Sequence, residues 1–325
     1  MINSKERILW ILYGMVLVLL FLLSSTDLII KEKEMQVYAV SVIVEDTTDD
    51  NYVNFRKGMD RAAIEYNLDV SFITLYDERN REQQKELIMR EQQDGSRALI
   101  VSPVDPGHIL QLQEEKRISI PLVFLNSEIS STGEGKTARI TFDYYQMGQE
   151  LAEQMLAEQP PGQRIFLLGD SHPDQISRQF QEGVLHALEE SGQESAFLKG
   201  RREGDLKAQT EKELLRQPRQ TVLIVLDPKN LTEIAQMLSE ENLSGEIGGL
   251  YGRGTTVRLL NYLDRGVIRG LSVTDDFTAG YLSVRTAAEL VANRQVPDAG
   301  YLESHYIRRE DLRNEAYEKM LYPIE

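Results

Sequence analysis

The feature that most constrains the fold is a regular alternation, from about residue 38 onward, of short apolar runs with longer amphipathic segments. The apolar runs are rich in β-branched residues, which is typical of strands that are buried on both faces of a parallel sheet. The expected strands are 38–44, 70–75, 98–102, 122–125, 139–142, 164–168, 194–199, 221–226, 245–250 and 270–273. The expected helices are 51–66, 81–94, 146–158, 175–191, 207–216, 231–241, 255–265 and 279–293.

Strands that alternate with helices predict the α/β class, in which helices cover both faces of a mostly parallel sheet. A chain of 325 residues is long enough for two lobes of ordinary domain size. Gly95, Gly192 and Gly266 fall where expected helices end, at positions that favour a left-handed backbone. We therefore expect two doubly wound parallel-sheet lobes.

The N-terminal region combines Lys5 and Arg7 with an apolar run over residues 8–23. A helix needs about 20 apolar residues to cross a membrane, and residues 8–30 suffice if Asp27 lies near the outer interface. Basic residues ahead of the run favour a cytoplasmic N-terminus. We therefore expect residues 1–34 to form a cytoplasmic tip, one N-terminal transmembrane helix and a charged stalk, with the soluble part extracytoplasmic in a single-pass protein of the cell membrane.

A cleaved signal peptide is the alternative reading of this region. Residues 23–26 offer small side chains at a possible cleavage point, but they contain no clear Ala-x-Ala site. A lipoprotein anchor is excluded, because that attachment needs a cysteine and the chain has none.

Composition excludes several classes of function. The chain carries 36 basic and 52 acidic residues, for a formal charge of -16, whereas a nucleic-acid surface needs a basic face. The absence of cysteine rules out disulfides, thiol catalysis and cysteine-ligated metals. The 4 histidines are scattered without ligand spacing, so we expect no metal site and no cofactor.

Several short motifs occur in a fixed order. They are Ser-Val-Ile-Val at 41–44, Asn-Tyr-Val-Asn-Phe at 51–55 with Gly58, Ser-Pro-Val-Asp-Pro at 102–106, Ile-Pro-Leu-Val-Phe-Leu-Asn at 120–126, Phe-Asp-Tyr-Tyr-Gln-Met-Gly at 142–148, Arg178 ahead of Gly183, and Asp-Asp-Phe at 275–277 ahead of Gly280. Each is weak alone. Together they give the chain, over about residues 38–310, a sequence that resembles the type I periplasmic binding proteins, with their ribose-binding and lac-repressor-like core.

The resemblance implies two lobes that are joined by a three-strand hinge, with a ligand held between them. The first lobe would comprise residues 35–142 and 275–302, and the second lobe and tail residues 143–274 and 303–325. The chain would cross between the lobes near Asp143, near Val273 and at 301–306. Lac-type repressors carry a DNA-binding motif where this chain has its apolar segment, so we do not expect a repressor.

The resemblance also implies which residues contact the ligand. Polyols are held by paired acceptors and donors, a bidentate arginine and an aromatic face. The corresponding positions in the first lobe and at the start of the second are Asp49, Tyr52, Asp105, Asn126 and Arg178. Each has a structural alternative: Asp49 and Asp105 as helix caps, Tyr52 as lobe packing, Asn126 as a loop-ordering residue and Arg178 as a solvated helix residue.

The second lobe departs from the family pattern. Leu226 stands where the family often has an asparagine, ahead of Asp227, and Tyr251 replaces the aspartate of a Gly-Phe-Asp turn. Thr274 replaces a cleft glutamine and is followed by Asp275. We include Asp227, Tyr251, Thr274 and Asp275 among the expected ligand contacts, and we expect fewer polar contacts here than in a ribose binder.

These features predict a membrane-tethered sugar receptor, with a pentose favoured, that closes on its ligand and signals through a partner such as a sensor histidine kinase. The alternative is the substrate-binding subunit of an ABC sugar importer, acting with a permease. An enzyme is not expected, because no nucleophile–base pair, P-loop or metal spacing is present. A ligand-free scaffold for protein partners remains a further alternative.

Overall fold

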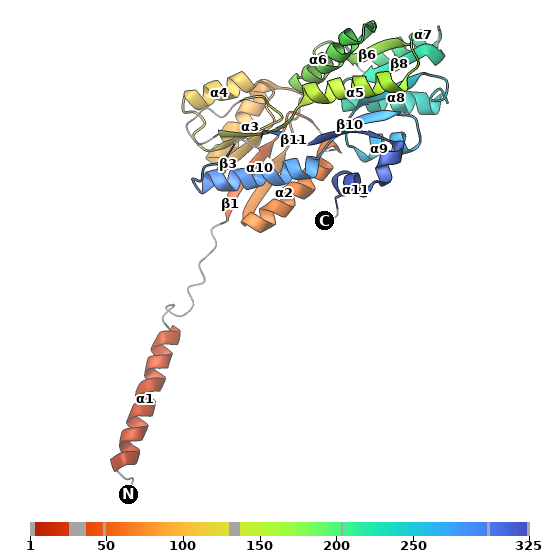
Figure 1. Cartoon of the computed structure of the whole chain (residues 1–325). Helices are drawn as coiled ribbons and strands as arrows, with labels where there is room; N and C mark the ends of the chain where they lie inside the picture. Colours follow the sequence, from red (N-terminus) through yellow and green to blue (C-terminus); the bar gives the residue numbers. More distant parts are fainter. Residues whose placement is uncertain are drawn as a thin grey trace. The chain divides into compact units, whose positions relative to one another are not determined.

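The protein was analysed as a computed structural model, which describes residues 4–25, 37–47, 50–129, 137–202, 204–216, 218–297 and 300–323 (Figure 1). The chain divides into two units, Met1–Val37 and Tyr38–Glu325. All buried hydrophobic side chains of the described residues lie from Val40 onward. Residues 38–325 therefore contain the core of the protein and have what they need to fold on their own.

The first unit contains one helix, α1 (Ser4–Ser25), of 22 residues. Among the described residues, no helix has both the length and the apolar character that a membrane crossing requires. The predicted single-pass anchor within residues 1–34 is therefore not confirmed and stays a prediction.

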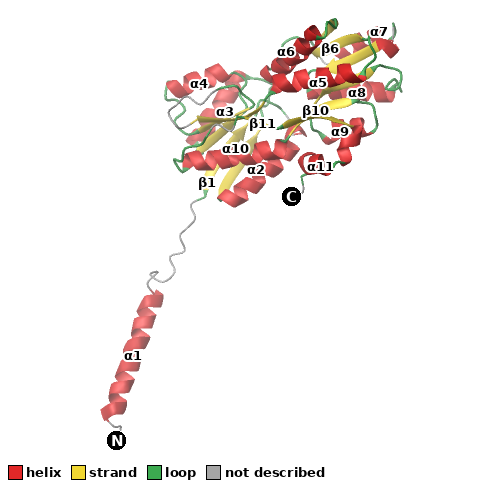
Figure 2. Cartoon of the chain, viewed as in Figure 1, coloured by secondary structure: helices red, strands yellow, loops and turns green. Residues whose placement is uncertain are grey.

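The second unit contains two six-stranded sheets (Figure 2). In the first sheet, all strands pair in parallel. Its order is β2 (Leu68–Ile73), β1 (Tyr38–Ile43), β3 (Ala98–Val101), β4 (Leu122–Leu125), β5 (Thr137–Phe142) and β11 (Tyr301–Leu302). The second sheet repeats this order with β7 (Ser195–Gly200), β6 (Arg164–Asp170), β8 (Thr221–Val225), β9 (Gly249–Arg253), β10 (Gly270–Thr274) and the antiparallel β12 (Ser304–Arg308).

Helices cover both faces of each sheet, as doubly wound sheets require. On the first sheet, α2 (Val53–Tyr66) and α10 (Asp276–Val291) pack on one face, and α3 (Arg81–Gln93) and α4 (Pro106–Glu114) on the other. On the second sheet, α5 (Tyr144–Glu158) and α6 (Gln175–Glu190) pack on one face. The other face is covered by α7 (Asp205–Leu214), α8 (Pro228–Glu240) and α9 (Val257–Asp264). Short elements complete the chain: η1 (Asp50–Tyr52), η2 (Pro218–Gln220), η3 (Arg309–Arg313) and α11 (Glu315–Leu321).

The core follows the two-residue period of the strands. In β4, Val123 and Leu125 join the cluster under α2 and α10, whereas Leu122 and Phe124 join the cluster under α3 and α4. Because both faces are buried, every side chain of this strand is apolar. This arrangement explains why the strands read as continuous apolar runs in the sequence.

The chain passes between the two sheets at three places. It leaves β5 of the first sheet for α5, returns from β10 of the second sheet to α10, and passes finally from β11 to β12. These are the predicted crossings near Asp143, Val273 and 301–306. The lobe boundaries that we assigned to individual residues stay a prediction.

The predicted α/β class with two parallel-sheet lobes is confirmed, and each expected strand and helix has a counterpart. The predicted left-handed residues Gly95, Gly192 and Gly266 have φ values of 104°, 68° and 72°. The expected strand at 245–250 was wrong in position, because β9 begins only at Gly249. Helix α4 was missed, since Pro106 and Gly107 suggest a turn although proline at the first helical position starts a helix well.

Candidate functional site

A cavity of about 770 Å³ lies at the carboxyl ends of the strands of both sheets. Its lining comes from the segments that follow β1, β2 and β4 in the first lobe and β6, β8, β9 and β10 in the second. Ligands of open α/β sheets bind at this edge, where the strand order reverses. The two sheets share one order, so their carboxyl edges present matching sets of loops to the same cavity.

Two carboxylates directly after β1 form part of the first-lobe wall. Asp46 accepts a hydrogen bond of 3.0 Å from the Asn51 side chain. Burial, together with the charge of Asp174 in the second lobe, raises the pKa of Glu45 from 4.5 to about 8, and the Arg79 guanidinium opposes this shift. Glu45 is therefore a proton-holding acid that faces a carboxylate of the other lobe.

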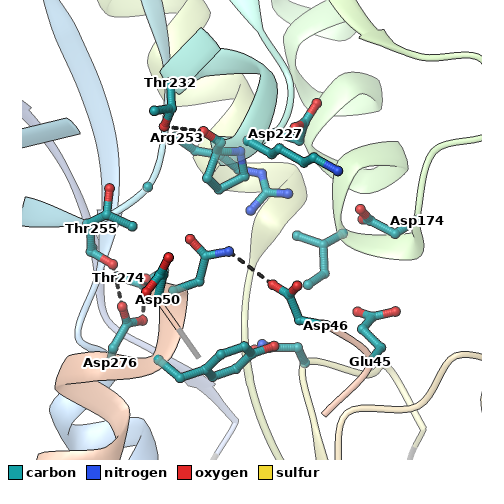
Figure 3. A pocket seen from close by; sticks show the side chains of 18 of the residues that line it. Glu45, Asp46, Asp50, Asp174, Asp227, Thr232, Arg253, Thr255, Thr274 and Asp276 are labelled. Carbon is teal, nitrogen blue, oxygen red and sulfur yellow. Dashed lines mark hydrogen bonds between the residues drawn. The ribbon is translucent and has the colours of Figure 1, made fainter. Parts of the chain in front are cut away.

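Asp276 contributes a third carboxylate, from the first turn of α10. Its side chain accepts hydrogen bonds from Thr274 Oγ1, at 2.7 Å, and from Thr255 Oγ1 (Figure 3). Burial raises the pKa of Asp276 to about 6, although both threonine hydroxyls favour its ionised form. Asp276 is thus fixed in orientation at the point where the chain crosses from β10 to the first lobe.

The second-lobe carboxylates cap helices that begin at the cavity. Asp174 accepts from the backbone N–H of Ser177 at 2.6 Å, and Asp227 accepts from the backbone N–H of Asn230 at 2.8 Å. Each sits at an N-cap, where a carboxylate satisfies an unpaired backbone donor. Burial raises the pKa of Asp227, and its hydrogen bonds to Asn230 oppose that shift.

Arg253, at the end of β9, is an arginine that the second lobe directs into the cavity (Figure 3). Its Nε donates to the carbonyl oxygen of Leu226 at 2.9 Å, and its Nη2 donates to Ser177 Oγ at 3.1 Å. Its guanidinium carbon lies 5.7 Å from the centre of the Tyr144 ring and 5.9 Å from that of Phe180. These contacts hold the side chain in one conformation. The sequence analysis missed Arg253.

The lining is dominated by hydrogen-bond acceptors. Among the described residues of the lining, nine side chains are carboxylic acids and four are basic: Glu45, Asp46, Asp50, Glu78, Asp170, Asp174, Asp227, Glu233 and Asp276, against Arg79, Lys229, Arg253 and Arg258. Carboxylates accept from hydroxyl groups, and a fixed arginine donates to oxygen. Within the described part of the chain, no group of three or more His, Cys, Asp or Glu residues has the arrangement of a metal site.

Four of the sequence-predicted residues line the cavity: Tyr52, Asn126, Asp227 and Thr274. Asn126 follows β4, has a left-handed backbone with φ of 54°, and accepts a hydrogen bond of 3.0 Å from Tyr144 Oη. Thr274 is the last residue of β10 and orients Asp276. Asp49 lies outside the described residues, so its role as a ligand contact stays a prediction.

The structure does not bring the other four predicted residues to the cavity. Asp105 caps α4 through the backbone N–H of His108 and pairs with Arg81 at 3.3 Å. Asp275 caps α10 through the backbone N–H of Thr278 at 2.9 Å, so its neighbour at 276 is the residue that faces the cavity. For Asp105, the helix cap that we held as the alternative describes its position, whereas the cap at Asp275 was not anticipated.

Tyr251 and Arg178 are also absent from the described lining. Tyr251 is fully buried, and its hydroxyl accepts from Gln159 at 2.7 Å and donates to Glu158 at 3.2 Å, at the far end of α5 from the cavity. Arg178 is solvent-exposed on α6. Arg253 of β9 reaches the cavity, and Arg178 of α6 does not, because the strand end, unlike the exposed helix face, opens directly at the carboxyl edge of the sheet.

The comparisons with known proteins that find a match agree with one another on the family of this chain. A profile described as "Periplasmic binding protein domain" matches residues 40–295. No curated protein sequence matches the chain. Among solved structures, GanP, a glucose-galactose binding protein from Geobacillus stearothermophilus, is 18% identical with a TM-score of 0.72, covering 86% of this chain and 99% of that one.

Two further structures extend the comparison. An ABC transporter solute-binding protein from Agrobacterium vitis, bound with alpha-D-tagatopyranose, is 17% identical with a TM-score of 0.75, covering 88% of this chain and 100% of that one. The complex of the TorS sensor domain with TorT contains a chain that is 16% identical with a TM-score of 0.75, covering 89% and 98% of the two chains. The chain thus has the fold of periplasmic sugar-binding proteins, and it belongs to the periplasmic binding protein family, whose members are binding proteins rather than enzymes.

Proposed function

We propose that this protein is an extracytoplasmic receptor that binds a small sugar between its two lobes. The observation that carries the proposal is the placement of partly buried carboxylates from both lobes around one cavity, together with the fixed guanidinium of Arg253. Glu45, Asp46 and Asp276 come from the first lobe, and Asp174 and Asp227 from the second. A ligand that carries several hydroxyl groups would bond to both sides at once.

Binding of this kind favours closure of the lobes. A ligand that bonds to both walls stabilises the arrangement in which the walls are close, and three chain crossings provide the hinge. Tyr52 and Tyr144 supply aromatic surface to the lining, which suits the apolar face of a sugar ring. A pentose is the favoured ligand, and hexoses belong in the same test because the cavity of about 770 Å³ accommodates either.

We further propose that closure is read by a membrane partner, most simply the extracytoplasmic part of a sensor histidine kinase. The TorS–TorT complex supports this, because in it a sensor domain accompanies a chain of this fold. An anchor within residues 1–34 would hold the receptor beside such a partner and raise its effective concentration there. Support for the anchor comes from α1, whose side chains from Ile8 to Leu22 are mostly apolar and exposed.

The alternative function is the binding subunit of an ABC sugar importer. Structures of similar fold from Agrobacterium vitis are described as ABC transporter solute-binding proteins with bound sugars, one of them D-fucose. The two functions differ in what happens to the N-terminus. Membrane fractionation of the full chain, with mass spectrometry of its N-terminus, separates them: an intact anchored chain favours the receptor, and a cleaved and freely soluble one favours the importer.

The test of ligand binding is thermal unfolding of residues 38–325 against a panel of pentoses and hexoses. A ligand that binds only the folded state raises the Tm by mass action, by an amount that grows with its concentration. We expect at least one monosaccharide to raise the Tm. An unchanged Tm across the whole panel would overturn the sugar proposal in favour of a different ligand or a ligand-free scaffold.

A further inference from the structure

A pair of adjacent residues in the first lobe reaches across the mouth of the cavity to the second lobe. The guanidinium of Arg79 donates to the backbone oxygen of His172 at 2.9 Å and to Asp170 Oδ2 at 3.3 Å. Beside it, Glu78 pairs with Lys229 at 3.3 Å. Glu78 and Arg79 lie between β2 and α3, whereas Asp170 ends β6, His172 follows it, and Lys229 lies in the first turn of α8. These contacts therefore join the two lobes directly.

The loop that carries Arg79 is held in place from several sides. The backbone N–H of Leu75 donates to the carbonyl oxygen of Asp46 at 2.9 Å. Gln83, in the first turn of α3, accepts from the backbone N–H groups of Tyr76 and Asp77 at 3.0 and 3.1 Å. The loop is thus bonded to both the first-lobe wall of the cavity and the following helix, so it presents Arg79 from a fixed base.

The backbone of Arg79 has an uncommon conformation. Of the six non-glycine residues with positive φ in the described part of the chain, four are asparagines, which tolerate the left-handed region. Arg79, with φ of 55°, is not of that type. A disfavoured backbone persists where surrounding contacts fix it, and here those contacts include the bonds to Asp170 and His172.

The same residues border a second, outer pocket. This pocket has a volume of about 500 Å³, and its wall shares Glu78, Arg79, Asp170 and Lys229 with the main cavity. The interlobe contacts consequently stand where the cavity meets its outer mouth. Any separation of the lobes at this edge would have to break them.

From these observations we propose that Glu78 and Arg79 form an interlobe latch, which favours the closed arrangement of the lobes through bonds between protein groups alone. The latch adds to the proposed sugar-driven closure. It does not depend on the identity of the ligand, because each of its bonds joins two groups of the protein. It predicts that the protein samples the closed form before a ligand binds, and that the latch residues set how often it does so.

The latch is modest in strength. The side chains of Arg79 and Asp170 are 30% and 42% exposed, and those of Lys229 and Glu78 are 73% and 45% exposed, so solvent weakens both pairs. We expect loss of the latch to lower the ratio of closed to open molecules by roughly three- to tenfold. This range is what half-exposed ion pairs and one further hydrogen bond from a charged group typically contribute. Salt should weaken it in the same direction.

The absence of cysteine from the chain permits a direct measurement of the distance between the lobes. Glu86→Cys on α3 and Lys212→Cys on α7 place one exposed label site in each lobe. Double electron–electron resonance spectroscopy is carried out on residues 38–325, spin-labelled at both cysteines, without sugar. It gives the distribution of distances between the two labels. We expect a population at the closed distance, and a shift toward longer distances when Arg79→Ala is added.

Arg81→Ala is the matched control. Arg81 is also an arginine at the start of α3, but its partners, Glu82 and Asp105, lie in its own lobe, so its loss should leave the distance distribution unchanged. Lys229→Ala is a second test at a highly exposed position, which removes the risk that a folding defect explains the result. An unchanged distribution in both Arg79→Ala and Lys229→Ala at low salt would overturn the latch. Because no sugar is used, that outcome is independent of the test of sugar binding.

Discussion

Gly58 of α2 and Gly280 of α10 lie at the crossing of the two helices, where each glycine faces the backbone of the other helix. A Cβ at Gly58 would fall 1.9 Å from the carbonyl oxygen of Phe277, and one at Gly280 would fall 2.0 Å from that of Phe55. Gly148 and Gly183 repeat this relationship between α5 and α6. The helix pair that supports each sheet thus depends on two glycines that let the backbones approach.

We predict that Gly58→Ala lowers the free energy of unfolding by about 1–3 kcal/mol, because backbone atoms cannot move aside as the end of a side chain can. Urea unfolding of residues 38–325 measures this change. Gly107→Ala in α4 is the control: its new Cβ would meet only the Asp105 side chain, at 3.5 Å, so stability should change by less than about 1 kcal/mol. Equal losses in the two variants would contradict this account of helix packing.

The raised pKa of Glu45 predicts how stability depends on pH. Its carboxyl has a pKa of about 8 in the folded protein and 4.5 when unperturbed, so between these values the folded state holds a proton that the unfolded state releases. Stability should therefore fall as pH rises from about 4.5 to 8. Asp276, with a folded pKa of about 6, adds to the fall only at the acidic end of this range.

The change in stability between pH 6 and 8 should therefore come mainly from the ionisation of Glu45. We expect a loss of about 1–3 kcal/mol over this interval in the parent protein, and a flatter profile in Glu45→Gln, which cannot ionise. Chemical unfolding at intervals of half a pH unit provides the comparison. Parallel profiles for the parent and Glu45→Gln would show that Glu45 is not a buried acid.

The adjacent aspartates 275 and 276 should have separable effects. Asp275→Ala removes the cap of α10 and should cost about 1 kcal/mol of stability while leaving ligand affinity unchanged. Asp276→Asn alters a group of the cavity lining and should weaken sugar binding about tenfold or more. Titration calorimetry with the sugar found in the Tm panel measures both affinities. The reverse pattern would place Asp275 in the site, as the sequence analysis expected.

Tyr251 provides a corresponding test in the second lobe. Its hydroxyl bonds only to Gln159 and Glu158 among the described contacts, so Tyr251→Phe should reduce stability by about 1 kcal/mol without changing sugar affinity. Thermal unfolding and calorimetry on the same preparation distinguish the two effects. A loss of affinity at unchanged stability would return Tyr251 to the binding site.

The fold could be predicted from the sequence largely because buried parallel strands are apolar on both faces, as in residues 122–125, and alternate with helices. Residues such as Gly95 were predictable because a local backbone requirement determines them. The candidate site was less predictable. Tyr251 and Arg253 lie in the same strand, yet only the second, at the strand end, opens into the cavity, whereas the first reaches toward the far end of α5.

The latch could not be predicted for a similar reason. Arg79 follows a strand in a polar segment like many others, and its role depends on the position of Asp170 in the other lobe. Nothing in the spacing of residues 79 and 170 indicates that they meet. Contacts between lobes depend on how the two sheets are placed by the hinge, which local sequence patterns do not specify.

The measurement that tests the central claim most directly is calorimetric titration of residues 38–325, and of two arginine variants, with the monosaccharide that raises the Tm most. Arg253 is fixed at the cavity by its bonds to Leu226 and Ser177, whereas Arg178 is exposed on α6. We predict that Arg253→Lys loses about tenfold or more in affinity, since lysine cannot reproduce the planar set of donors, and that Arg178→Ala binds like the parent. Unchanged affinity in Arg253→Lys, with loss in Arg178→Ala, would contradict the site described here.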